Sequence, residues 1–177
     1  MIDPAGDELP EIAADLPAWA ESVAVRLAFF AYQDRSSSAE AELRAVLTVL
    51  RGRIAEAGDG VRADFMQACL DLLESEAAAR PEFAVLRDEL LGMCAMARAA
   101  LAGDCDDRPL LAREYALPDL SNVAFCASRV PGRVVWLAAM AVHAPQEEGA
   151  AAAMLVNDLA AVSRDLPLRA LAQATGR

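Results

Sequence analysis

The chain has 177 residues, of which 56% are hydrophobic, and its formal net charge is −11 at pH 7. This length and apolar content fit one domain, residues 1–177, with a sizeable core, and exclude a mainly disordered protein. The negative charge, without a basic stripe interleaved with aromatic residues, argues against nucleic acid as a partner.

The N-terminal segment, MIDPAGDELPEIAADLP, is acidic where a signal peptide would be basic and then apolar, so we expect a cytoplasmic protein. A first helix is predicted from Pro17, with Asp15 as its cap, through AWAESVAVRLAFFAYQD to the breaker RSSS. The C-terminal end of this helix is aromatic and then polar. Its residues there are Phe29, Phe30, Gln33 and Asp34.

Three more helices are predicted before residue 102, each from apolar residues at helical spacing. The second opens at Ser36–Ser38 and buries Leu43, Leu47, Leu50 and Ile54. The third carries Phe65, Cys69, Leu72 and Leu73 and ends before Pro81, where the fourth begins and presents Leu86, Leu90, Met93 and Ala97. The four cysteines of the chain form no C-x-x-C pair, and with a single histidine they indicate buried thiols rather than a zinc site.

The second half of the chain begins with a break at LAGDCDDRP. The stretch LLAREYALPDLSNVAFCASRVPG predicts a helix interrupted at Pro118 or two short helices, and RVVWLAAMAVHAP predicts a short helix ended by Pro145. These apolar stretches are too short for a membrane span. QEEGAAAAMLVNDLAAVSRDL predicts the last long helix, and the tail PLRALAQATGR offers at most two weak turns.

Polar residues interrupt the last long helix, which is otherwise apolar nearly all round. Asn157, Ala161 and Asp165 fall on one strip at steps of four residues, with Asp158 seven residues before Asp165. Because a buried carboxylate needs a partner, a cation or a solvated cavity, we expect this strip to face a polar pocket or a partner on another helix. The alternative is an Asn–Asp pair that ties helices together.

The segment NDLAAVSRD resembles the second metal-binding motif of class I terpene synthases, N-D-x-x-S-x-x-(K/R)-E. Asn157, Asp158 and Arg164 match the motif, Asp165 stands at the Glu position, and Ala161 replaces the Ser ligand. RPLLAREYALPDLSNVAF is similar to the segment before the kinked helix of that family, with Glu114 and Tyr115 matching. The resemblance runs from about Leu9 to Leu166.

Several positions depart from the family pattern. QDRSS stands where the aspartate-rich motif D-D-x-x-D belongs, so Gln33 and Ser37 replace acidic residues and Asp34 alone remains. The diphosphate-sensing Arg of the family falls near Pro118 and Asp119. The chain also ends soon after the metal-binding helix. The resemblance therefore implies that the family chemistry, magnesium-triggered loss of diphosphate, would be impaired.

The resemblance implies an all-α fold: a single bundle of about seven helices around an apolar cavity, similar to a truncated class I terpene synthase. Asp34, Asp158 and Asp165 are then the candidate catalytic residues. Substrate would contact Phe29, Phe30, Gln33, Met93, Tyr115, Phe125, Trp136 and Asn157. The sequence further predicts that Gln33, Asp34, Asn157 and Asp165 converge on one cavity.

Three functions follow from this interpretation. The first is a cyclase of lyase or isomerase type, which folds an apolar polyene or polyketide-like substrate for natural-product biosynthesis without a metal or other cofactor, an Asp in the pocket acting as acid. The second is a magnesium-dependent synthase acting on a prenyl diphosphate. The third is a noncatalytic helical module that binds an apolar ligand or another protein, or forms a homodimer through its exposed apolar surface.

Overall fold

The computed structural model describes residues 37–104 and 122–176, which contain six α-helices, one 3-10 turn and no strand. The all-α prediction is therefore confirmed for these residues. The predicted first helix, from Pro17 to Asp34, lies outside them.

The helices before residue 104 follow the predicted pattern, except that Leu43, Leu47 and Leu86 are only partly buried. α2 (Ser37–Glu56) buries Leu50 and Ile54 completely, and α3 (Asp59–Ala79) buries Phe65, Cys69 and Leu73. Pro81 opens a short 3-10 turn, η1 (Pro81–Phe83), before α4 (Arg87–Leu101). The fourth helix thus begins six residues later than Pro81.

α6 (Asn122–His143) is one continuous helix of 22 residues, where the sequence predicted a break after Pro131. A proline inside a helix removes one hydrogen bond and costs about 3 kcal/mol. Burial offsets this cost, because the residues around Pro131 fill the core: Val130, Val134, Val135 and Leu137 are fully buried. By length and composition Val123–His143 could cross a membrane, but 56% of the apolar 18-residue window within it is buried inside the bundle, and the core helix of a soluble protein passes the same test.

The last two helices differ from the prediction at their junction. α7 (Pro145–Val162) ends three residues before Asp165, and the tail forms a regular helix, α8 (Leu166–Ala174). Pro167 in the first turn of α8 fits a helix start, because its missing N–H is not needed there. Leu166, Leu168 and Leu171 are buried, so α8 is stabilised by packing rather than by its short length.

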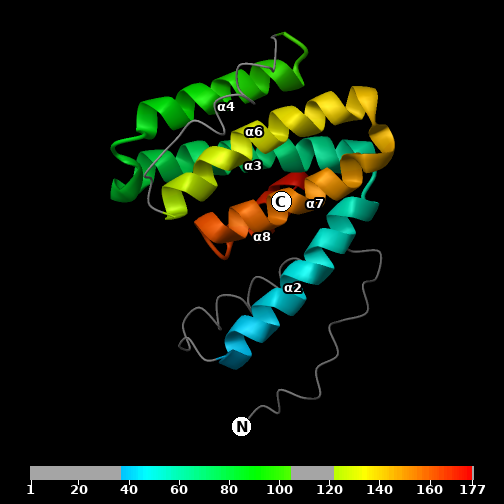
Figure 1. Ribbon diagram of the computed structural model, residues 1–177, viewed down its shortest axis with the longest axis horizontal. Helices are drawn as coiled ribbons and strands as arrows, with labels where there is room; N and C mark the ends of the chain where they lie inside the picture. The colour runs from blue at the N-terminus through cyan, green and yellow to red at the C-terminus, as the bar shows by residue number, and fades with distance from the viewer. Residues whose placement is uncertain (1–36, 105–121, 177) are drawn as a thin grey trace.

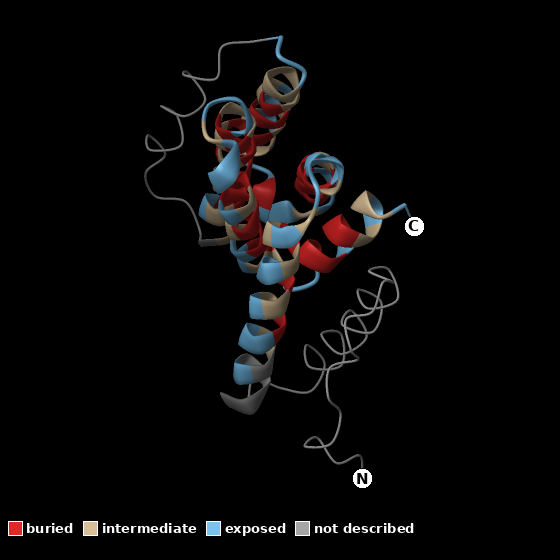
Figure 2. Ribbon diagram, turned by 90° about the vertical axis from the view of Figure 1, so that its right-hand side faces the viewer, coloured by how far each residue is buried: buried red, intermediate tan, exposed pale blue. Residues whose placement is uncertain are grey.

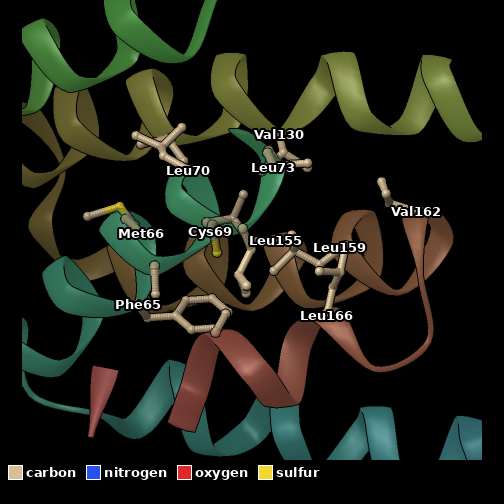
Figure 3. Close-up of a cluster of buried hydrophobic side chains, with 14 of the residues drawn as sticks. Phe65, Met66, Cys69, Leu70, Leu73, Val130, Leu155, Leu159, Val162 and Leu166 are labelled. Carbon is tan, nitrogen blue, oxygen red and sulfur yellow. The ribbon is translucent and has the colours of Figure 1, made fainter. Parts of the chain in front are cut away.

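The core lies where α3, α6, α7 and α8 meet (Figure 3). Phe65, Cys69 and Leu73 of α3 face Leu155 and Leu159 of α7 there, and all five are fully buried. α4 covers the other side of α6, next to α3 (Figure 1). Buried residues lie where the helices meet and exposed residues on the outside (Figure 2).

α2 packs chiefly on α7, and its N-terminal half extends beyond the other labelled helices (Figure 1, Figure 2). The two helices touch at Gly149 of α7. A Cβ atom at this position would lie 3.2 Å from the carbonyl carbon and 3.3 Å from the Cα of Ala55, and nearer still to its carbonyl oxygen. Glycine is therefore required for this close approach.

Charged side chains hold the helix ends together. Arg62 of α3 contacts the Asp59 carboxylate and lies 3.4 Å from Glu148 of α7, and both Arg62 and Glu148 are buried. At the other end of α3, the Glu76 carboxylate pairs with Arg80 and, at 2.9 Å, with Arg169 of α8. Both carboxylates join separate elements of the bundle.

Candidate functional site

The structure describes six of the eleven residues predicted to form a site. Phe29, Phe30, Gln33, Asp34 and Tyr115 lie outside the described residues, so their convergence with the others stays a prediction. The remaining six are Met93, Phe125, Trp136, Asn157, Asp158 and Asp165.

The polar strip predicted on the last long helix does not lie on one helix. Asn157 and Ala161 are exposed residues of α7, whereas Asp165 lies beyond Ser163, whose extended backbone ends the helix. The Asp165 carboxylate accepts a hydrogen bond from the Ser163 hydroxyl and lies 3.6 Å from Arg169. Asn157, Ala161 and Asp165 all face solvent and do not line a described pocket.

Asp158 is the half-buried carboxylate of this segment. Its Oδ2 accepts a hydrogen bond from Arg133 Nε of α6 at 3.2 Å, and the two side chains are 15% and 17% exposed. Burial raises the pKa of Asp158, against the opposing influence of Arg133 and Arg129. Asp158 therefore ties α7 to α6, which agrees with the expectation of a partner on another helix. The alternative of a buried Asn–Asp pair holds only for the Asp, because Asn157 is exposed.

Two aromatic residues of α6 make cation–π contacts with arginines of the same helix. The Arg129 guanidinium lies 5.5 Å from the centre of the Phe125 ring, and that of Arg133 lies 5.7 Å from Trp136. Such contacts hold both partners and contribute about 0.5–1 kcal/mol each at exposed sites. Phe125 is exposed, whereas Trp136 is partly buried and packs against the hydrophobic core. Neither residue lines the small hollow beside Met93.

Met93 lines a small hollow between η1, α4 and α6. Its other lining residues include Phe83, Leu90, Ala124 and Ser128. The hollow measures about 10 Å³, which admits at most one water molecule. The predicted apolar cavity is therefore not present within residues 37–104 and 122–176, because side chains of α3, α4 and α6 fill the space.

No group of three or more His, Cys, Asp or Glu side chains that could hold a metal ion occurs among the described residues. Asp158 has Arg133 as its neighbour, and Asp165 has Arg169. The positive charge of the neighbouring guanidinium group would repel a metal cation from either carboxylate. These two acids alone do not form a magnesium site.

α7 has an outer face that is largely exposed along the helix. It consists of Glu147, Ala150, Met154, Asn157 and Ala161, of which Met154 is half-buried and the others are exposed. α2 packs on one flank of this face, at Gly149, and α6 packs on the other, at Asp158. The face between them is not covered by any of the described helices.

Sequence reasoning missed two features of this site. Arg133 is the partner of Asp158, and an arginine inside the apolar run of α6 was its only signal. Glu147 and Ala150 belong to the same exposed face as Asn157, which the 3.6-residue period could have shown. Comparison of the chain with protein families, curated proteins and solved structures found no match.

Proposed function

We propose that this chain is a noncatalytic helical module that binds another protein through the outer face of α7. One observation carries the proposal: Asn157, a metal ligand under the terpene synthase resemblance, lies exposed in the middle of a face that no described helix covers. An exposed helix face of small and adaptable residues suits the docking of another helix.

The state of the carboxylates supports a binding function over catalysis. A catalytic acid must reach a substrate, but the Asp158 carboxylate is held by Arg133 and the Asp165 carboxylate by Ser163 and Arg169. A cyclase also needs a cavity the size of its substrate. The hollow beside Met93 holds at most one water.

The chemistry of the face fits a protein partner. Ala150 and Ala161 let another backbone approach closely, Met154 adapts to its neighbour, and Asn157 offers a donor and an acceptor in the centre. A central polar residue in a helix–helix contact fixes the register of the two helices. Such a face gives specificity without a deep pocket.

Thermal stability in the presence of ligands tests this function. The full chain is melted with magnesium and a set of prenyl diphosphates, and in parallel with neutral apolar polyenes. Since a ligand that binds the folded state raises the melting temperature by mass action, a noncatalytic protein-binding module shows no shift with either set. A magnesium-dependent shift with a diphosphate, lost in Asn157→Ala, would overturn the proposal in favour of a synthase.

The pKa of Asp158 favours a second candidate, the terpene-synthase-like cyclase. Burial raises this pKa, as a general acid in a cyclase pocket requires. In that case Asp158 would protonate an apolar substrate. A melting shift with neutral polyenes that disappears in Asp158→Asn would support this candidate against the first.

A further inference from the structure

The connection between α2 and α3 is short and contains a break in helical geometry. α2 ends at Glu56 and α3 begins at Asp59, so only Ala57 and Gly58 lie between them. Gly58 has φ −68°, which is a helical value, but ψ 161°, where a helix requires about −42°. At Gly58 the departure from a helix therefore lies in ψ alone.

The residues around this break are otherwise compatible with one continuous helix. The N–H of Arg62 donates to the carbonyl oxygen of Gly58 at 3.1 Å, which is the bond that such a helix would also make. No proline occurs from Ser37 to Ala79. A Cβ atom at Gly58 would meet no atom within 4 Å, so a side chain is tolerated there. A helical ψ at Gly58, with Ala57 helical as well, would join α2 and α3 end to end.

The position of α2 depends on this bend. α2 packs chiefly on α7, and its N-terminal half extends beyond the other labelled helices (Figure 1). Leu50 and Ile54 of α2 are fully buried, and Ala55 meets α7 at Gly149. If α2 continued α3 in a straight line, it would leave α7 of its own chain and expose these residues. A second copy of the chain offers the identical α7 surface.

We propose that α2 exchanges between two copies of this chain, with Gly58 as the hinge. In the exchanged dimer each α2 continues α3 as one helix and packs on α7 of the other copy. Every contact of α2 with α7 is then the contact that the single chain makes, including the close approach at Gly149. Exchange of an identical element is a low-cost route to a dimer. The exchange does not use the outer face of α7, so it is independent of the proposed function.

Arg62 favours the bent form of the single chain. Its guanidinium donates hydrogen bonds to the carbonyl oxygen of Ala57 and to the Asp59 carboxylate, and it lies 3.4 Å from Glu148 of α7. In a continuous helix the Ala57 oxygen would accept the N–H of Val61 instead. Exchange therefore replaces a side-chain hydrogen bond by a backbone one at each junction, and the two forms differ little in hydrogen bonding there.

The short connection sets the concentration at which exchange occurs. In the single chain two residues tether α2 next to its own α7, which corresponds to an effective concentration in the millimolar range. A second copy must compete with this tethered α2. The wild type should therefore be monomeric at micromolar concentration and partly dimeric after refolding from urea at millimolar concentration.

Two substitutions at the junction should change the exchange in opposite directions. Gly58→Ala favours the continuous helix, because alanine is the best helix former and a poor N-cap. Asp59→Pro favours the bend, because proline suits the first position of α3 and Gly58 already has the extended backbone that a following proline requires. In a continuous helix the same proline would be an interior residue and would break it.

Sedimentation velocity of the full chain, refolded at micromolar and at millimolar concentration, measures the dimer. The dissociation constant should be at least about 100-fold lower for Gly58→Ala than for the wild type, because the substitution acts at both junctions. Asp59→Pro should be monomeric at both concentrations. The double variant, with Gly58→Ala and Asp59→Pro, should be monomeric as well, whereas a side-by-side dimer gives no reason for the proline to reverse the effect of the alanine.

Two control variants match these changes. Gly52→Ala makes the same replacement inside α2, where the residue is exposed and a Cβ atom meets nothing within 4 Å, and should leave the dissociation constant unchanged. Asp59→Ala removes the same carboxylate as Asp59→Pro but should still allow exchange. Circular dichroism verifies that every variant is folded. The proposal would be overturned by a wild type or Gly58→Ala protein that stays monomeric at millimolar concentration, or by a double variant that dimerises like Gly58→Ala.

Discussion

The contact between α2 and α7 at Gly149 leads to a specific prediction. Replacing glycine by alanine should lower the stability of the protein at Gly149 and raise it at Gly92. A Cβ atom at Gly149 would lie 3.2 Å from a backbone carbon of Ala55, and nearer still to its oxygen, whereas one at Gly92 of α4 would have no neighbour within 4 Å. The atoms it meets are backbone, so α2 must move as a unit.

The magnitudes follow from two competing terms. Replacing glycine by alanine inside a helix stabilises the folded state by about 1 kcal/mol. An added group that is too large for its space costs about 1–3 kcal/mol, and the cost lies near the upper limit here because the new Cβ would meet backbone atoms. Gly149→Ala should therefore lower the free energy of unfolding by about 1–2 kcal/mol, and the melting temperature by about 3–8 °C. Gly92→Ala should raise the melting temperature by about 1–4 °C.

Both variants are measured by calorimetry at one protein concentration, so that any self-association affects them equally. Amide hydrogen exchange should also show faster exchange in α2 for Gly149→Ala and no change there for Gly92→Ala. If alanine at Gly149 stabilises the protein as it does at Gly92, α2 does not pack on α7 at this distance, and the described position of α2 is wrong.

Three other predictions concern single side chains. Burial raises the pKa of Asp158, so the folded wild type loses stability as the pH rises above about 4 and this carboxyl group ionises. Asp158→Asn cannot ionise, so its melting temperature should rise relative to that of the wild type between about pH 4 and 7. Glu76→Gln leaves two arginines without their shared carboxylate and should cost about 2 kcal/mol in urea unfolding. Iodoacetamide should alkylate Cys126 before Cys69, which is fully buried, and Cys94, where burial raises the pKa to about 12; peptide mass spectrometry gives the order.

Helical spacing predicted those helices in which apolar residues lie along one side and are buried in the core. Phe65, Cys69 and Leu73 of α3 are buried as their spacing indicates, and Leu50 and Ile54 of α2 as well. The helix ends of this region are close to the predicted breakers, Pro81 among them. Local pattern and burial agree there, so the sequence was sufficient.

Packing between distant segments decided the parts that were predicted wrongly. Separate helices were expected before and after Gly132, but α6 continues through Pro131 because the valines on either side are buried in the core. The tail was expected to be weakly structured, yet Leu168 and Leu171 of α8 are buried in the bundle, chiefly against α3. A prediction from neighbouring residues does not include the free energy of contacts between residues that are far apart in the sequence.

The same limit applies to the candidate site. The period of α7 placed Asn157 and Ala161 on one strip correctly, but it could not show whether that strip faces a cavity or solvent, because this depends on which helices flank α7. α2 and α6 occupy its two flanks and leave the strip open. The proposed protein-binding surface accounts for an exposed Asn in the middle of this strip, whereas a pocket wall formed by the described helices does not. The melting assay with Asn157→Ala separates these explanations, since only a metal-binding pocket gives a diphosphate-dependent shift that this variant removes.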